Sequence, residues 1–423
     1  MNRTFLFISM LALSLSCSNP IAKDKTQDLA LSKLSVQLDS VFDVHGLMGL
    51  ETVLLLEGEV AYHYKNGFRD YERNLQIDDQ TIYRIASISK TITATAVMQL
   101  VERGQLDLNT DVSAYLGWSL QNPSHPDSPI TLHHLLSHQS GIRDGKGYGN
   151  FTRNMRKQQL DIKELFQPKG KYFSEDLFAN HKPGEYFSYT NCTWGIIASI
   201  IEKVSDLRFD QYCKQHIFDP LDIAGSFNVL DIEDINDLAT LYRYDSIEWK
   251  VQVDHYQGVK PDSVIYRNYQ LGQNGLLFGP QGSLRVSSND LVKLAQMMMQ
   301  GGTLDGTKIL DPGSLENMKK GHYVFEDNNG DTWEDFFLSY GYGLHRILNK
   351  ENGDIIFPDR KMYGHPGIAY GLLSDMYFDP VTKSGVIFIT NGSKYDFKYG
   401  QSSSFYEVEE AVFQVLYEDI KSL

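Results

Sequence analysis

The sequence predicts an α/β protein of the α+β kind, in which an antiparallel sheet is flanked by helices and interrupted by an inserted all-helical subdomain. Strand-like patterns of apolar residues occur near both ends of the chain. The stretch between them, about residues 105–290, has few strand patterns and is rich in helical periodicity. Strands at both ends with helices between them indicate one sheet assembled from distant segments, within a single domain over residues 23–423.

The elements can be placed in chain order. Residues 31–41 have the spacing of an amphipathic helix, and residues 53–64 are typical of a hairpin that turns at Glu57-Gly58-Glu59. Inside the insertion, helices are predicted over residues 131–138 and 194–204. The late elements are strands over residues 340–348, 369–379 and 385–390, a turn at residues 380–383, and a closing helix near residues 404–417.

Composition limits the class of partner. The chain has 423 residues, of which 42% are hydrophobic and 22% charged, as in ordinary globular proteins. Its formal net charge of −15, with no basic tract to offset it, argues against a nucleic-acid or anionic-membrane partner. We therefore expect the partner to be a small molecule or a short peptide. The protein is also expected to be a monomer and to use no cofactor.

The first residues resemble an export signal. A short basic start precedes an apolar stretch over residues 5–15 that is too short to span a bilayer, and Cys17 follows a possible processing site. Residues 1–22 thus predict a signal peptide. The pattern is similar to a bacterial lipoprotein signal with Cys17 as the anchor, although Ser14 replaces the preferred leucine, so plain secretion stays open. Either route predicts an extracytoplasmic protein. Cys192 and Cys213 lie in helical patterns and are predicted core residues.

Ser87 and Lys90 form the most informative pair in the chain, because no other serine has a lysine three residues later. On a helix, residues three apart share a face, with Cβ atoms about 5 to 6 Å apart. The lysine amine can then take the serine proton and create a nucleophile. The apolar spacing of residues 91–101 predicts a buried helix, whose N-terminal N–H groups and positive dipole end suit an oxyanion beside Ser87.

Tyr189 and Asn191 supply a second proton carrier and an amide that can bind a substrate carbonyl. A turn at residues 183–185 precedes them and an apolar helix over residues 192–201 follows, which favours a fixed loop at a helix start. The same spacing recurs at Tyr148 and Asn150 and at Tyr266 and Asn268, in Gly-rich or polar loops. Context therefore favours Tyr189.

His365, Gly367 and Ile368 belong to a Gly-rich stretch that enters a predicted strand. Such a strand offers the substrate an edge and a second N–H for the oxyanion, and its glycines allow close backbone approach. His365 is predicted to act as a weak donor or cation over the cleft. A competing lysine, Lys383, follows Pro380 in a hairpin turn and is more simply a solvated turn residue.

In this order, the three motifs resemble those of the serine β-lactamase and DD-peptidase superfamily. More narrowly, the chain resembles the branch related to class C β-lactamases, which also holds esterases and D-amino-acid peptidases. The resemblance implies a β-lactamase/transpeptidase-like fold and a covalent acyl-enzyme formed without a metal. It makes Ser87 the nucleophile, Lys90 the principal base and Tyr189 the proton shuttle, with the N–H groups of Ser87 and Ile368 as the oxyanion hole. Further supporting stretches are residues 83–87, 131–141, 183–191, 340–343 and 389–392.

One departure from this family favours an esterase or peptidase. In β-lactamases of this branch the third motif begins with a lysine and a threonine, which bind the carboxylate of the drug, whereas here those places hold His365 and Pro366. A histidine is mostly neutral near pH 7 and proline has no donor. Cleavage of acyl esters or D-amino-acid peptides is thus expected. A β-lactamase or penicillin-binding DD-peptidase stays an alternative, as does a non-catalytic receptor for peptidoglycan fragments.

Two other catalytic designs fit the sequence less well. His134 and His138 stand four residues apart like zinc ligands, but no glutamate follows His134 and no cysteine is near. The Gly-x-Ser-x-Gly elbow of α/β-hydrolases is absent from the sequence. No metal site is therefore predicted.

Overall fold

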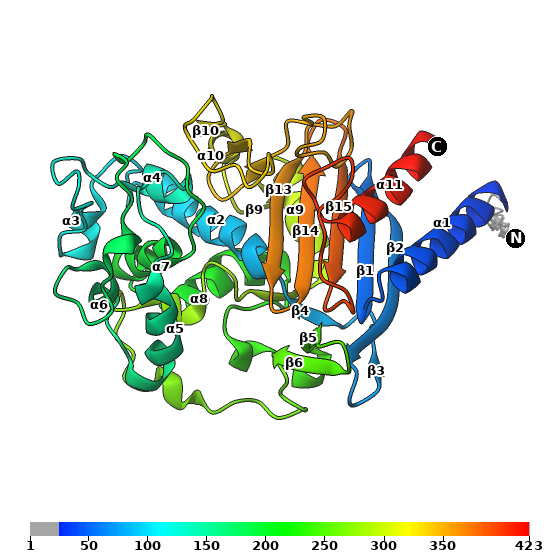
Figure 1. The fold of residues 1–423 in the computed structure, drawn as a ribbon, viewed down its shortest axis with the longest axis horizontal. Helices are drawn as coiled ribbons and strands as arrows, with labels where there is room; N and C mark the ends of the chain where they lie inside the picture. The colour runs from blue at the N-terminus through cyan, green and yellow to red at the C-terminus, as the bar shows by residue number, and fades with distance from the viewer. Residues whose placement is uncertain (1–24, 423) are drawn as a thin grey trace, which may run out of the picture.

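The computed structural model describes residues 25–422, so the predicted signal peptide and Cys17 lie outside the described residues. Figure 1 shows a large sheet in one half of the molecule and a helical half beside it. Nine strands of the described chain form this sheet, and every neighbouring pair is antiparallel. In spatial order they are β10 (Tyr323–Val324), β11 (Ser339–Tyr340), β12 (His345–Arg346), β13 (Tyr363–Ala369), β14 (Leu372–Asp379), β15 (Ser384–Thr390), β1 (Gly49–Leu56), β2 (Glu59–Asp70) and β3 (Leu75–Gln76). Because β1 pairs with β15, the prediction of one sheet built from both ends of the chain is confirmed.

Helices cover both faces of the sheet. One layer consists of α1 (Lys25–Val44) and α11 (Glu407–Ser422), and the other includes α2 (Ser89–Glu102) and α9 (Ser288–Met299). Alternate residues of β15 enter the two cores: Phe388 packs in a cluster with Leu38 and Val412, and Ile387 joins a cluster with Leu291. Because both faces are covered, the strand is apolar without interruption.

The helical half lies between β4 (Ile82–Arg84) and β7 (Arg285–Ser287), which pair with each other. Its helices are α3 (Val112–Leu116), α4 (Leu132–Leu136), α5 (Lys146–Gln158), α6 (Lys163–Phe166), α7 (Cys192–Ser205) and α8 (Phe209–Cys213). The predicted helices over residues 131–138 and 194–204 are confirmed as α4 and α7. This half is not entirely helical, because β5 (Leu241–Tyr244) and β6 (Trp249–Val253) form a hairpin. The hairpin is attached to the main sheet, since the N–H of Tyr242 donates to the carbonyl of Asn391 at 2.9 Å.

The turns explain several predicted boundaries. Glu57 and Gly58, with φ values of 53° and 87°, join β1 to β2 at the predicted hairpin turn. Residues 340–348, predicted as one strand, are two short strands, β11 and β12, separated by Gly343 with φ of 63°. A Cβ on Gly343 would lie 2.8 Å from the carbonyl oxygen of Lys90, so the chain turns here to pack against α2. The remaining short elements are β8 (Thr303–Leu304), β9 (Thr307–Lys308) and α10 (Pro312–Lys319).

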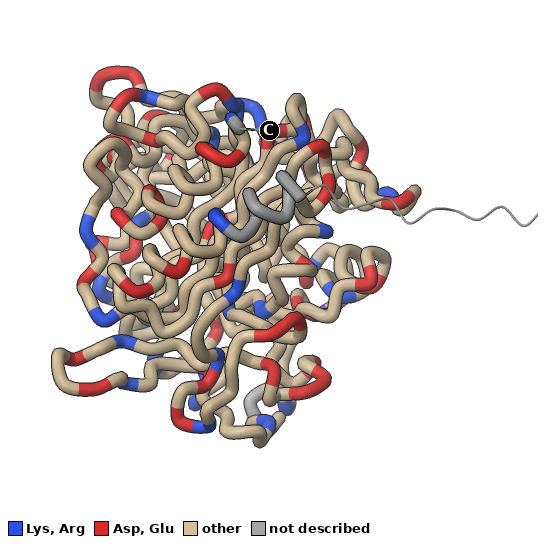
Figure 2. The backbone as a smooth tube through the Cα atoms, turned by 90° about the vertical axis from the view of Figure 1, so that its right-hand side faces the viewer, with Lys and Arg blue, Asp and Glu red and all other residues tan. Residues whose placement is uncertain are grey.

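The surface and the cysteines agree with the composition. Acidic positions outnumber basic ones and are spread over the whole chain trace (Figure 2). Cys192 and Cys213 are free and buried, as predicted. Within residues 25–422, no helix has both the length and the apolar character that crossing a bilayer requires.

Candidate active site

Ser87 lies in a one-turn 3₁₀ helix, Ala86–Ile88, directly before α2. Ala86 has a positive φ of 45°, which a non-glycine residue rarely adopts, so the surrounding contacts must hold this turn. Ser89 supplies two of them, because its Oγ donates to the carbonyl of Ala86 at 2.6 Å and accepts from the N–H of Leu284 at 3.0 Å. The turn thus presents Ser87 at the N-terminal end of the buried helix α2.

Lys90 is fully buried, and its Nζ lies 3.0 Å from Oγ of Ser87. The same nitrogen donates to Oδ1 of Asn191 at 2.8 Å and to the carbonyl of Gln281 at 2.9 Å. Burial lowers the pKa of Lys90 to about 7, and the carboxylate of Asp144 opposes part of this shift. A neutral amine has two N–H bonds, which the two carbonyl acceptors take, so its lone pair is left for the proton of Ser87.

Tyr189 shares a hydrogen bond with Ser87, and the centroid of its ring lies 4.8 Å from Nζ of Lys90. Its ring is held by stacking on Phe337, with centroids 5.0 Å apart, and by edge contact with Trp333 at 5.1 Å. The centroid of His138 lies 4.5 Å from it. Burial raises the pKa of the Tyr189 phenol, so this group keeps its proton at neutral pH. Tyr189 is thus equipped to pass a proton on, while Lys90 accepts one first.

Asn191 is oriented by Asp144, a residue that the sequence reasoning missed. The Asp144 carboxylate accepts from Nδ2 of Asn191 at 2.8 Å and from the main-chain N–H groups of Asn191 and Cys192 at 3.0 and 2.8 Å. It thereby caps α7, whose own N-cap residue makes no side-chain cap. The sequence signal for this role is weak, because Asp144 is one acidic residue in a polar loop. The role of Gln281 has no sequence signal, because Lys90 donates to its main-chain carbonyl, which every residue has.

The third motif forms β13, but the structure places His365 differently from the expectation. His365 is fully buried, and its Nε2 is 2.8 Å from the hydroxyl of Tyr340, while its Nδ1 is 2.6 Å from the carbonyl of Pro366. Burial, and then the charge of Lys90, lower the pKa of His365 well below its usual value. A strand alternates its faces, so Pro366 and Ile368 reach the pocket while His365 does not. His365 is neither a cation over the cleft nor part of its wall.

Gly367 lets β13 approach the serine turn closely. A Cβ at this position would lie 2.5 Å from the carbonyl oxygen of Ile85 and 2.3 Å from Oγ of Ser374. Ser374 ties the same two segments together, because its Oγ donates to the carbonyl of Ile85 at 3.0 Å. The next residue, Ile368, is half exposed beside Ser87 and lines the same pocket.

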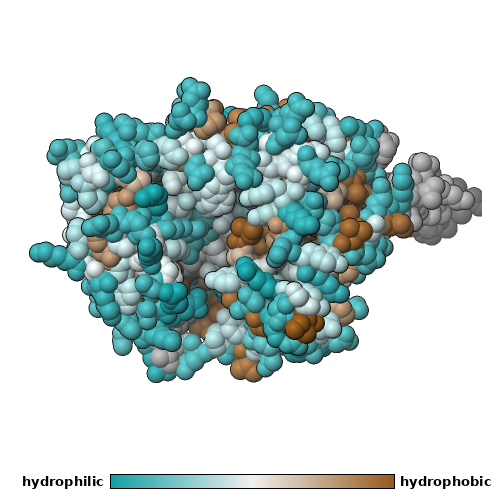
Figure 3. All heavy atoms as spheres, viewed as in Figure 1, coloured by the Kyte–Doolittle hydropathy of each residue, from teal (hydrophilic) through white to brown (hydrophobic). Residues whose placement is uncertain are grey.

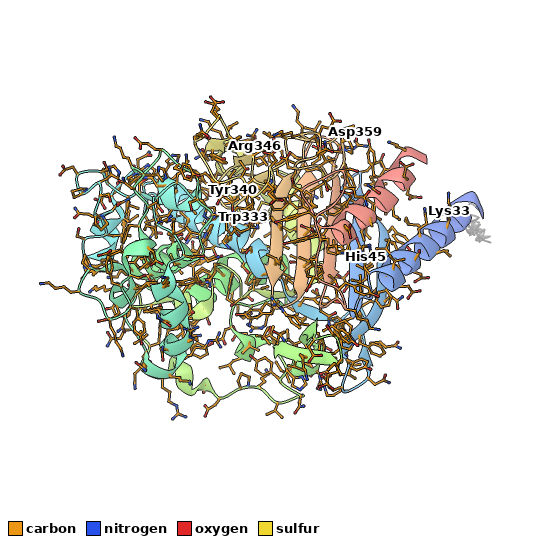
Figure 4. The ribbon with its side chains drawn as sticks, in the orientation of Figure 1. Lys33, His45, Trp333, Tyr340, Arg346 and Asp359 are labelled. Carbon is orange, nitrogen blue, oxygen red and sulfur yellow. The ribbon has the colours of Figure 1, made fainter. Side chains whose placement is uncertain are left out.

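A pocket of about 150 Å³ opens beside the serine. Ser87, Tyr189 and Asn191 line its near end, and the rest of its wall is mainly apolar and aromatic. Figure 4 shows Trp333 and Tyr340 in the region between the helical half and the sheet. Figure 3 shows several small hydrophobic groups on a mostly hydrophilic face, one of them near its centre. The other lining residues are Trp333, Phe336, Phe337, Pro366, Gly367, Ile368, Leu373, Tyr399, Ser404, Phe405, Tyr406 and Glu409.

The competing motifs have other partners. The hydroxyl of Tyr148 accepts from Nε2 of Gln281 at 3.3 Å, and Tyr266 stacks on Phe278. Lys383 is exposed in the turn between β14 and β15. Of the three tyrosines considered, Tyr189 is the one with a hydrogen bond to Ser87.

The two histidines considered as zinc ligands bind the main chain. Nδ1 of His134 accepts from the N–H of Thr131 at 3.3 Å, in the capping box of α4. Nδ1 of His138 accepts from the N–H of Thr190 at 3.2 Å, which fixes the loop that carries Tyr189. In the described part of the chain, no three or more His, Cys, Asp or Glu side chains are grouped so that they could hold a metal ion.

Comparison with known proteins agrees with this geometry. The Beta-lactamase family model matches residues 41–401. Penicillin-binding protein 4* of Bacillus subtilis (strain 168) is 26% identical over 357 residues, which cover 83% of this chain and 70% of that protein. Esterase EstB of Burkholderia gladioli is 34% identical over 119 residues, or 27% of this chain and 30% of that protein.

A solved structure gives the same fold. D-amino acid amidase from Ochrobactrum anthropi SV3, complexed with L-phenylalanine amide, has a TM-score of 0.65 and 21% identity, and the match covers 94% of this chain and 99% of that one. The family model spans most of the chain, and Ser87, Lys90 and Tyr189 meet at one pocket. The chain therefore belongs to the β-lactamase family, and it is a serine hydrolase.

Proposed function

We propose that this serine hydrolase is exported and cleaves an acyl ester or a D-amino-acid peptide through a covalent acyl-Ser87 intermediate. The observation that carries the proposal is the lining of the pocket beside Ser87, which contains no lysine or arginine. The β-lactam carboxylate would therefore find no permanent cation there, while the methylene groups of an acyl chain would meet apolar walls. The export-like pattern of the first residues supports the location.

The reaction follows from the positions of three side chains. Neutral Lys90 takes the proton of Ser87 as Oγ attacks the carbonyl carbon of the substrate. We assign the oxyanion to the main-chain N–H groups of Ser87 and Ile368, at the N-terminal end of α2 and on β13. Tyr189 passes its proton to the leaving group and takes up the proton that Lys90 received from Ser87, so the leaving group departs and the acyl-enzyme remains with neutral Lys90 and Tyr189. Water then attacks the ester carbonyl, Ser87 recovers its proton, and the acid is released.

The names of the relatives support two substrate classes. Esterase EstB and D-amino acid amidase are each similar to part or all of this chain, and their names describe ester and amide cleavage. Penicillin-binding protein 4* is similar over a longer stretch of sequence, so a β-lactam-binding or DD-peptidase activity is the second candidate. The absence of a lysine or arginine from the pocket wall favours the first reading.

A turnover panel tests the proposal. Purified protein and its Ser87→Ala variant would be given short p-nitrophenyl esters, D-alanyl peptides and a chromogenic cephalosporin, with the acyl-enzyme followed by intact mass. We expect turnover of esters or D-peptides that Ser87→Ala abolishes, with slow acylation by the cephalosporin. Faster turnover of the cephalosporin would favour the β-lactamase reading. Labelling of Ser87 without product release would indicate a receptor that binds without turnover.

A further inference from the structure

Glu409, which lines the pocket beside Ser87, belongs to a pair of buried carboxyl groups that the proposed reaction does not use. Glu409 of α11 lines the pocket and is 3% exposed, and Asp375 of β14 is fully buried next to it. Asp375 is the cross-strand partner of Pro366. Directly paired residues point to the same face of a sheet, and Pro366 lines the pocket, so Asp375 lies on the same face of the sheet as this wall of the pocket.

Among the residues that the structure describes, neither acid has a basic partner. Oε2 of Glu409 accepts from the N–H of Tyr406 at 2.8 Å, and its carboxylate also accepts a hydrogen bond from Asp375. In the described part of the chain, no amide, hydroxyl or basic group donates to either oxygen of Asp375. The other titratable groups facing the pair are the phenols of Tyr377 on β14 and Tyr406 before α11, and neither is cationic.

The pair carries one uncompensated charge. Burial raises the pKa of Asp375 well above its usual value, and it raises the pKa of Glu409 to about 7. A protonated Asp375 can donate to the Glu409 carboxylate, so above pH 7 the two groups share a single negative charge. A buried charge without a partner is costly, and a ligand that brings a cation would relieve this cost.

The walls of the pocket suit a chain that ends in a cation. Aromatic faces attract cations within about 6 Å, and they also pack against methylene groups. A cavity of about 150 Å³ is large enough for a molecule of the size of benzene, which has about six non-hydrogen atoms. The aromatic side chains that line the pocket together with Glu409 are Trp333, Phe336, Phe337, Tyr399, Phe405 and Tyr406.

We propose that this pocket is a subsite for an acyl group that ends in an ammonium, with Glu409 binding the ammonium, Asp375 supporting Glu409 from behind, and the aromatic side chains contacting the chain that leads to it. The inference rests on the proposed function, because Ser87 at the near end defines where the acyl carbonyl lies. The aliphatic chain would run from Ser87 over Pro366 and Ile368 to α11.

Two isosteric esters test the subsite. p-Nitrophenyl 6-aminohexanoate and p-nitrophenyl heptanoate differ only by an ammonium in place of a terminal methyl. We expect kcat/KM at pH 8 to be at least tenfold higher for the amino ester. The ratio of the two values should fall as pH drops through about 7, because Glu409 takes up a proton. Titration of Lys90 affects both esters alike and cancels in the ratio.

Variants locate the effect. Glu409→Gln should bring the ratio close to one, and Asp375→Asn should lower it and shift its pH dependence. Glu418→Gln, on an exposed turn of the same helix, is the matched control and should keep the wild-type ratio. A wild-type ratio near one, or a ratio that Glu409→Gln and Asp375→Asn both leave unchanged, would overturn the proposal. Thermal unfolding of each variant shows whether it is folded.

A binding measurement separates this inference from the proposed function. The Ser87→Ala variant would be titrated calorimetrically with 6-aminohexanamide and with heptanamide. If neither ester is hydrolysed, the proposed function fails, but tighter binding of the amino amide that Glu409→Gln removes still supports the subsite. Equal binding of the two amides would overturn the subsite even where both esters are hydrolysed.

Discussion

Nζ of Lys90 lies 3.0 Å from Oγ of Ser87, and two fixed oxygens, from Asn191 and Gln281, occupy the other directions around that nitrogen. Within residues 25–422, no carboxylate is hydrogen-bonded to the amine. The charged group that acts on the pKa of Lys90 is the carboxylate of Asp144, which is hydrogen-bonded to Asn191, and Asn191 in turn accepts from Lys90. Burial of this nitrogen favours the neutral amine.

The first prediction concerns Lys90 itself. Its pKa of about 7, against 10.5 for a solvated lysine, corresponds to roughly 5 kcal/mol that disfavours the ammonium form. The base acts when it is neutral, so the acylation rate should rise with pH to a plateau above about 7 and fall about tenfold per pH unit below it. Lys90→Ala should lower acylation by more than about 10³-fold and remove this limb. Stopped-flow acylation across pH measures both effects, and circular dichroism controls for folding.

The second prediction concerns Tyr189 and the leaving group. Tyr189→Phe keeps the ring that stacks on Phe337 but removes the hydroxyl. An alkoxide or amine needs a proton in order to leave, and a p-nitrophenolate does not. We expect a loss of about 10²-fold with ethyl esters or amides, and less than tenfold with p-nitrophenyl esters. Tyr186→Phe, in the same loop, is the control. Equal losses with both leaving groups would instead assign Tyr189 to the activation of Ser87.

The third prediction treats Asp144 as a positioning residue. Its carboxylate raises the pKa of Lys90 against the effect of burial. Asp144→Asn should therefore shift the pH limb of acylation to lower pH, and it should lower the plateau about tenfold because Asn191 loses a charged acceptor. Asp176 accepts from the N–H of Lys146 at the start of α5 in a similar way. Asp176→Asn is therefore the control and should keep the wild-type pH dependence of acylation. A lower plateau with an unshifted limb would mean that Asp144 acts only on local structure.

The fourth prediction concerns the approach of β13 to the serine turn. The Cβ of Gly367→Ala would lie 2.5 Å from the carbonyl oxygen of Ile85, so β13 must move away from Ser87. We expect acylation to fall by about 10²-fold or more, while the protein stays folded. Gly313→Ala on α10 meets no atom within 4 Å and serves as the control. Wild-type acylation by Gly367→Ala would show that the position of β13 does not matter for catalysis.

Local sequence determined much of this protein. The spacing of Ser87 and Lys90 placed both residues at the start of a helix, and the structure brings their side chains within 3.0 Å. The turn at Glu57 and Gly58 and the apolar helix before Arg103 were predicted as well, because turns and helices depend on neighbours along the chain.

Tertiary structure decided the rest. The residues of β13 that reach the pocket are those on the face of the strand that meets it, and the sequence does not say which face this is. The sequence therefore led to the prediction that His365 lies over the cleft, whereas Pro366 and Ile368 lie there in the structure. The role of Asp144 depends on its contact with Asn191, which is 47 residues away in the sequence. The Glu409 and Asp375 pair depends on a contact between the last helix, α11, and the strand β14. No local sequence pattern identifies the partner of a charged side chain or of a main-chain carbonyl. Such contacts exist only once the sheet and helices have packed.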